Sequence, residues 1–299
     1  MREEPICPLM LRVCLLLWLG SLHLVTAAEP SFEYDQITPL DIQQTTEREQ
    51  DGATLRDITY TLGDRRNAAT LVEPKKFHSG TRAGVLFVHW YGPPEPTSNR
   101  TQFIPDAVEL AKAGAVSLLI DTPWSRPEYF RERTRDGDFA RSVQQVKDLR
   151  RALDVLLVQP AMDRDRIAYV GHDFGAMYGT LAAAVDPRIR AFGFMAGTRS
   201  FSDWFLYGKP QLEGEARQKF VDELAPLDPI QYLPKLKVPV LLQFADNDEH
   251  VSKERAEALA EAAPEPKTVH TYSVGHELNE AATRDRVAWL KDQMKLQVQ

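Results

Sequence analysis

The sequence predicts an α/β fold with a mostly parallel eight-stranded sheet flanked by helices and a small cap or none. From about Ala53 onward, short β-type runs alternate with amphipathic helical segments, a pattern typical of a parallel sheet covered on both faces. The chain has 299 residues, 43% hydrophobic and 26% charged, which is enough to bury one sizeable core. We therefore expect a single domain over residues 53–299.

The elements follow one another in a regular order. The expected strands are residues 54–62, 68–73, 84–89, 115–120, 166–171, 189–196, 238–245 and 267–274. The expected helices are residues 103–113, 140–158, 175–184, 253–262 and 281–295. Each helix follows a strand, so the carboxyl ends of the parallel strands should meet at one edge of the sheet.

Residues 1–28 resemble a secretory signal peptide. Arg12 precedes the apolar run 13–19, and the small residues Ala27 and Ala28 suit cleavage after either one. The apolar run is shorter than the roughly 20 residues that a membrane-spanning helix needs. We therefore expect a secreted or periplasmic protein with no stable membrane span after signal cleavage.

Either Met1 or Met10 could begin the signal peptide, and the sequence leaves this choice open.

Both cysteines, Cys7 and Cys14, lie in this leader, so the mature chain would have no thiol for a disulfide, a metal or a nucleophile. Residues 29–52 are polar and without sustained period. They are interpreted as an N-terminal extension on the surface.

Charge and composition limit the partners. The net charge is −7 and the pI is near 5.6, and lysines and arginines do not cluster as phosphate-binding patches require. We expect no nucleic-acid partner, no cofactor and a small-molecule substrate.

One motif lies at the centre of the sequence. The expected fifth strand runs directly into Gly171-His172-Asp173-Phe174-Gly175, and a helical segment follows. A strand, a G-x-nucleophile-x-G turn and a helix form a nucleophile elbow, in which the central side chain projects above the sheet. Such a pentapeptide also occurs by chance. Here the central side chain is the carboxylate of Asp173.

The partners of the elbow occur in the required order of nucleophile, acid and histidine. Asp248 follows the strand 238–245, and His276 follows the last strand in a Gly-His loop. Taken singly, they would be a turn-forming aspartate and a surface histidine, but three such residues in order predict a triad. Asp246, Asp248 and His250 also have the atoms of a metal site, but no second cluster accompanies them, so we predict no metal.

The loop after the third strand is expected to supply part of an oxyanion hole. Its donors would be the backbone N–H groups of Phe174 and of Tyr91 or Trp90. His89, at the end of the same strand, is interpreted as a buried structural histidine.

These motifs resemble the α/β-hydrolase superfamily, and within it the dienelactone hydrolase-like and prolyl oligopeptidase-like esterases. The resemblance covers roughly residues 54–295 and rests on His89-Trp90-Tyr91-Gly92, the elbow, Asp248 and Gly275-His276. The chain departs from these families in two ways: Asp173 replaces their Ser or Cys, and the first loop lacks the usual His-Gly pair.

The Gly-His-Asp-aromatic-Gly elbow is also similar to epoxide hydrolases and haloalkane dehalogenases, which use an aspartate nucleophile. Those families insert a large helical cap, whereas residues 197–237 leave room only for a short lid. Dehalogenases usually have Trp directly after the nucleophile, where this chain has Phe174.

A carboxylate is ionised at neutral pH and needs no activating base. The leading hypothesis is that Asp173 forms an ester with an sp3 carbon, as in an epoxide or alkyl halide, and that water activated by His276-Asp248 cleaves it. One alternative is an esterase or lactonase with Asp173 as base, and another is a non-catalytic binding scaffold. The substrate stays open.

Several side chains could line the site. Trp204 and Tyr207, in the lid segment 197–237, and Trp124 are candidate lid or substrate contacts, with core packing as the alternative. Five arginines could clamp an anionic substrate or form a solvated loop: Arg126, Arg131, Arg133, Arg135 and Arg141.

Overall fold

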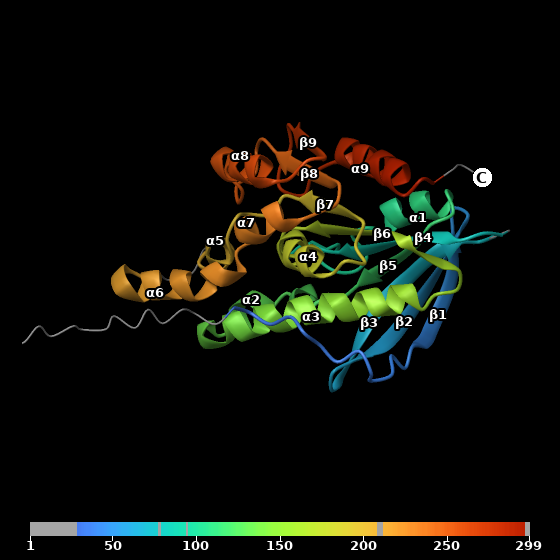
Figure 1. Cartoon of the computed structure of the whole chain (residues 1–299), viewed down its shortest axis with the longest axis horizontal. Coiled ribbons are helices and arrows are strands. Elements are labelled where there is room, and N and C mark those ends of the chain that lie inside the picture. Colours follow the sequence, from blue (N-terminus) through green and yellow to red (C-terminus); the bar gives the residue numbers. More distant parts are fainter. Residues whose placement is uncertain (1–28, 77–78, 94, 208–211, 297–299) are drawn as a thin grey trace, which may run out of the picture.

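The computed structural model describes residues 29–76, 79–93, 95–207 and 212–296. The predicted signal peptide, residues 1–28, lies outside this part. Figure 1 shows a twisted sheet between two layers of helices. The strand order is β1-β2-β3-β5-β4-β6-β7-β8-β9, so the predicted α/β fold with a mostly parallel sheet is confirmed.

The sheet has an antiparallel part and a parallel part. Three antiparallel strands come first: β1 (Gln43–Gln50), β2 (Ala53–Leu62) and β3 (Arg65–Pro74). Strand β3 also pairs antiparallel with β5 (Val116–Ile120). The parallel strands are β4 (Arg82–Val88), β5 (Val116–Ile120), β6 (Met162–His172), β7 (Ala191–Met195), β8 (Val240–Ala245) and β9 (Lys267–Tyr272). Their carboxyl ends lie at one edge, as expected.

The helices cover the two faces of the sheet separately. One face packs against α3 (Asp138–Leu157) and α4 (Phe174–Val185), and the other against α1 (Ile104–Ala111) and α9 (Glu280–Gln293). Helix α8 (Lys253–Ala262) lies between β8 and β9 in the chain and joins the α3–α4 core. Along β4, Leu86 and Val88 enter the first core while Val85 and Phe87 enter the second, which is the period-two alternation of a strand buried on both faces.

The sheet has nine strands among the described residues, one more than predicted. Residues 43–50, assigned to the polar extension, form edge strand β1 and pair with β2 from Gln43↔Thr59 to Gln50↔Ala53. All eight residues of β1 are exposed. Because neither face is buried, the strand carries no apolar alternation, and backbone pairing alone places it.

In the predicted lid segment, 197–237, the described residues include three short α-helices: α5 (Phe201–Phe205), α6 (Gly214–Leu224) and α7 (Pro229–Tyr232). In Figure 1 they extend to one side of the sheet beyond α4. Phe201 and Phe205 are buried, which ties α5 to the core. That this insertion acts as a lid stays a prediction.

Arg133, one of the five arginines considered for an anion clamp, contacts helix α5 of the segment 197–237 instead. Its side chain is 3% exposed and its Nε lies 3.2 Å from Asp138, while Nη2 donates to the carbonyl oxygen of Phe205 at 2.7 Å. The guanidinium also lies over the ring of Phe205, 4.4 Å from its centroid. A short helix, α2 (Tyr129–Glu132), precedes it.

No helix of the described residues has the length and apolar character needed to cross a membrane.

Candidate active site

Asp173 lies at the predicted elbow between β6 and α4. Its backbone has φ +54° and ψ −118°, a conformation rarely adopted by a residue with a side chain. A Cβ on Gly171 would collide with the carbonyl of Gly175, and a Cβ on Gly175 would collide with the carbonyl of Val88. The two glycines therefore permit the tight turn that projects Asp173.

The two oxygens of Asp173 have different surroundings. Oδ2 accepts a hydrogen bond from the backbone N–H of Tyr91 at 3.1 Å. Oδ1 is buried and has no partner in the protein. The side chain is fully buried, and this burial raises the pKa of Asp173 to about 7, although His276 and the N–H groups of Tyr91 and Phe174 favour the charged form.

His276 and Asp248 form a hydrogen-bonded pair, as the order of the motifs predicts. His276 Nδ1 lies 2.8 Å from Asp248 Oδ2. Asp248 Oδ1 accepts from the N–H groups of His250 at 2.8 Å and Val251 at 3.0 Å. With Nδ1–H donated to the carboxylate, Nε2 carries the basic lone pair, and this atom is buried without a partner.

Electrostatics match these roles. Burial alone would lower the pKa of His276, but the hydrogen bond to Asp248 and the charges of Asp173 and Asp248 raise it. Burial alone would raise the pKa of Asp248, but its bonds to His276 and to two backbone N–H groups lower it. Asp248 therefore stays ionised while His276 can accept a proton.

A buried relay of hydrogen bonds joins the oxyanion loop to the histidine loop. The N–H of Trp90 donates to Gln102 Oε1 at 2.9 Å, and Gln102 Nε2 donates to His172 Nδ1 at 2.6 Å. His172 Nε2 then donates to the carbonyl oxygen of His276 at 3.0 Å. Of the two donors that the sequence left open, Tyr91 is the one whose N–H faces Asp173, because the N–H of Trp90 donates to Gln102.

Two further expectations concern buried rings. His89 is structural as expected, since its ring nitrogens lie 2.7 Å from the Trp90 carbonyl and 2.9 Å from the Thr122 hydroxyl. Trp124 is 1% exposed and donates its indole N–H to the His89 carbonyl at 3.1 Å. Trp124 is therefore a core residue rather than a substrate contact.

Trp204 lies against His276, and Tyr207 contacts Trp204 and His250, a histidine to which the sequence assigned no role. The ring centroid of Trp204 lies 5.5 Å from that of His276. His250 lies 5.0 Å from His276, 4.9 Å from Trp204 and 4.7 Å from Tyr207. The position of His250 two residues after Asp248 was the one available signal, because a turn that presents the acid also presents its neighbours.

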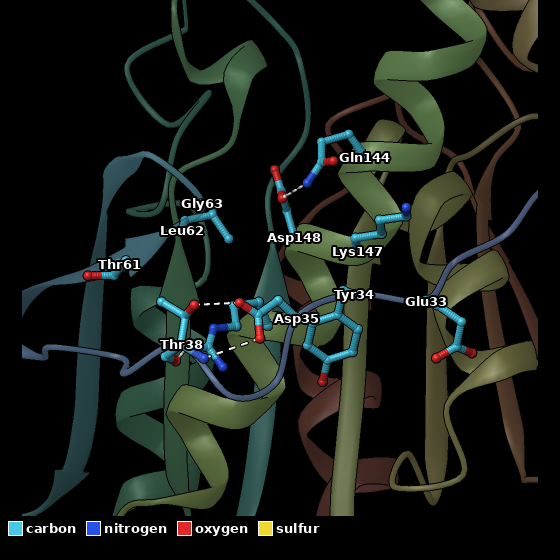
Figure 2. Close-up of a pocket in the computed structure, with 11 residues that line it drawn as sticks. Glu33, Tyr34, Asp35, Thr38, Thr61, Leu62, Gly63, Gln144, Lys147 and Asp148 are labelled. Carbon is cyan, nitrogen blue, oxygen red and sulfur yellow. Dashed lines mark hydrogen bonds between the residues drawn. The ribbon is translucent and has the colours of Figure 1, made fainter.

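A pocket of about 300 Å³ lies elsewhere, between the N-terminal segment, the β2–β3 turn and α3. Figure 2 shows that its polar side chains pair with one another: Thr38 with Asp35, and Gln144 with Asp148. Asp148 also binds Arg65 at 2.6 Å. This pocket contains none of Asp173, Asp248 and His276.

Within the described ranges, no three His, Cys, Asp or Glu side chains group as metal ligands.

The fold and the elbow define the class as α/β hydrolase, and solved structures agree. The acetyl xylan esterase from Paenibacillus sp. R4 has a TM-score of 0.70 at 17% identity, covering 85% of this chain and 89% of its own. Acetyl xylan esterase 1 from Thermoanaerobacterium sp. has a TM-score of 0.69 at 17% identity, covering 86% and 89%. A putative dienelactone hydrolase from Klebsiella pneumoniae has a TM-score of 0.58 at 16% identity, covering 81% and 98%.

The sequence itself identifies the family. The model of the prolyl oligopeptidase family matches residues 103–296, which include Asp173, Asp248 and His276. The chain therefore belongs to the prolyl oligopeptidase family, as its motifs predicted. No curated protein matches the chain in sequence. Serine is the usual nucleophile in this family, so Asp173 is a departure within it.

Proposed function

We propose that the protein is a hydrolase in which Asp173 attacks an sp3 carbon, such as that of an epoxide or an alkyl halide, and forms a covalent ester. The observation that carries this proposal is the asymmetry of the carboxylate. Oδ2 accepts the N–H of Tyr91, whereas Oδ1 is buried without a partner. One oxygen is thus held by the oxyanion donor, and the other is the free nucleophile.

This asymmetry favours an alkyl substrate over an ester. In a serine hydrolase, the oxyanion hole receives the carbonyl oxygen of the substrate. Here Asp173 Oδ2 takes that position, and the N–H groups of Tyr91 and Phe174 stabilise its charge. If Oδ1 bonds to carbon, Oδ2 becomes the carbonyl oxygen of the new ester and already lies in the hole.

The reaction then has two balanced steps. First, Oδ1 bonds to the carbon as the bond to the leaving group breaks, and the electron pair departs with that group. Next, a water loses a proton to His276 Nε2 and attacks Cγ of Asp173, while Tyr91 and Phe174 stabilise the charge on Oδ2. Collapse of this intermediate frees the alcohol, which takes the proton from His276, and leaves the Asp173 carboxyl group with one oxygen from water. The second proton of the water then leaves this carboxyl group and restores the carboxylate: it neutralises the alkoxide formed from an epoxide, or passes to solvent alongside a halide ion.

A second candidate is hydrolysis of a carboxylic ester or lactone with Asp173 as general base. It is favoured by the pKa of Asp173, raised to about 7 by burial, which suits proton abstraction near neutral pH. The family and the esterases among the similar structures agree with it. In this mechanism, water attacks the substrate and no bond to Asp173 forms.

Isotope labelling separates the two candidates. In single turnovers in H2(18)O with matched epoxides, alkyl halides and esters, the proposal expects ¹⁸O in the peptide that contains Asp173. The His276→Gln variant should accumulate an adduct on the same peptide, because the ester forms but water is not activated; Asp173→Asn is the control without adduct. Turnover without label or adduct would select the second candidate, and no turnover with any class would favour a binding scaffold.

We also propose that the protein is exported, on the strength of the charged, apolar and small-residue order in residues 1–28. Expression of the full chain followed by fractionation and N-terminal sequencing tests this. A mature N-terminus at Ala28 or Glu29 is expected, and an intact leader on a cytosolic protein would contradict it.

A further inference from the structure

His276 and two rings in contact with it share an unusual feature: each of the three has a buried nitrogen without a hydrogen-bond partner. These atoms are His276 Nε2, His250 Nδ1 and Trp204 Nε1. The three rings contact one another, with centroid distances of 4.9 to 5.5 Å. Buried polar groups in folded proteins are nearly always satisfied, and exceptions gather at functional sites.

The other buried histidines of the site make the contrast plain. His89 has partners on both ring nitrogens, and so does His172. Those two histidines are structural parts of the relay and the core. His250 instead shares the unpartnered state of His276, the base of the proposed mechanism.

Two observations define the hydrogen-bonding character of His250 and Trp204. His250 Nε2 lies 3.4 Å from the Glu249 carboxylate, which favours the proton on Nε2 and leaves a lone pair on Nδ1. Burial and the charge of His276 lower the pKa of His250, which favours the neutral form of its ring. The indole nitrogen of Trp204 can only donate.

We propose that Trp204 and His250 form a second polar subsite beside the triad, which binds a hydroxyl group of the substrate. The Trp204 N–H donates to the hydroxyl oxygen, and the hydroxyl donates to Nδ1 of His250. This donor and acceptor pair is complementary to an alcohol, and an alkyl group in its place leaves both nitrogens unsatisfied. The inference deepens the proposed function and rests on it for the substrate class: alkyl substrates that carry a hydroxyl near the reacting carbon.

The origin of the two residues fits a specificity role. His250 belongs to the acid turn, where its N–H holds Asp248, and Trp204 comes from the lid helix α5. A substrate hydroxyl would therefore bridge the rigid turn and the lid. Both nitrogens and Asp173 Oδ1 are buried, so the proposal requires α5, the described helix that carries Trp204, to shift when the substrate enters.

The test measures binding without turnover. Benzyl alcohol and ethylbenzene have nearly the same shape and differ by hydroxyl against methyl. Their Kd values are determined by ligand-observed NMR titration with the full-length purified protein and with three variants: Trp204→Phe, His250→Phe and His250→Gln. His270→Phe, on strand β9, is the matched control.

The ratio of the two Kd values, alcohol to hydrocarbon, is the measured quantity, because it cancels general changes of the pocket. The ratio should rise at least about tenfold in Trp204→Phe and in His250→Phe, since a lost bond to a buried polar group typically costs a factor of that order. It should change little in His250→Gln, which keeps an acceptor, and in His270→Phe.

An unchanged ratio in both phenylalanine variants would overturn the subsite, as would the absence of binding by the wild-type protein. A ratio that rises equally in His270→Phe would overturn it as well. Thermal unfolding identifies a variant that does not fold. If His250→Phe does not fold, His250→Gln tests position 250 instead: a Kd ratio at the wild-type value supports the subsite, and a changed ratio contradicts it. Because no turnover is needed, missing label in Asp173 would refute the proposed function and leave this result standing.

Discussion

Replacing the elbow aspartate should stabilise the protein while abolishing its proposed chemistry. In Asp173→Asn, the amide oxygen can still accept the Tyr91 N–H, and Asn is among the residues that best tolerate positive φ. The charge, however, is gone. Burial raises the pKa of Asp173 from 3.8 to about 7 in the folded protein, so ionisation of this side chain opposes folding.

The magnitude and its sign follow from this shift. A shift of about three pKa units at about 1.4 kcal/mol per unit corresponds to roughly 4 kcal/mol. Between pH 3.8 and about 7 the folded state binds the proton more tightly than the unfolded state, so the stability of the wild-type protein falls as pH rises through this window. The Asn variant should match the wild-type protein near pH 4 and exceed its stability by about 4 kcal/mol above pH 7.

Urea unfolding from pH 4 to 8.5, with both proteins side by side, measures this difference. Asp228 has a similarly raised pKa of about 7, but it is present in both proteins and cancels. A difference that does not change with pH, or an Asn variant no more stable at pH 8, would refute the argument that burial controls this carboxylate.

Substitutions at three other residues test the rest of the site. In Asp248→Asn, the proposed ester should form but hydrolyse about 10² to 10⁴ times more slowly, as single-turnover mass spectrometry would show; a normal rate would remove Asp248 from the mechanism. Gln102→Leu leaves the Trp90 N–H and His172 Nδ1 without partners and should cost about 2–3 kcal/mol in urea unfolding, whereas Gln102→Glu keeps the bond to Trp90 and should cost less. Arg133→Met leaves the Phe205 carbonyl without its donor and should speed proteolysis within residues 197–237; unchanged cleavage would mean that Arg133 does not hold the lid.

The sequence predicted the elements whose side chains are buried in the two cores. Strands β4 to β8 and helix α3 carry strong apolar patterns, because both faces of the sheet are buried. Strand β1 has no such pattern, since it is exposed along its whole length. Its place follows from backbone pairing with β2, which depends on no particular side chain.

In the candidate site, the order of residues along the chain predicted which side chains meet, but it did not predict the hydrogen bonds between neighbouring loops. Asp173, Asp248 and His276 follow strand ends, so their meeting at one edge follows from the parallel sheet. The choice between Trp90 and Tyr91 as donor depends on Gln102, which takes one of two consecutive N–H groups. Motif spacing carries no information about such a contact.

The position of Asp173 Oδ2 gives the serine-to-aspartate departure a physical meaning. A serine hydroxyl has one oxygen, which attacks, so the oxyanion donors remain for the substrate. A carboxylate has two, and at this elbow the Tyr91 N–H binds one of them. In the proposed mechanism, the hydrolase framework therefore stabilises charge on the enzyme's own ester instead of on a substrate carbonyl. On this proposal, the same acid, base and donors serve a different first step, because the residue at the elbow decides which carbonyl occupies the hole.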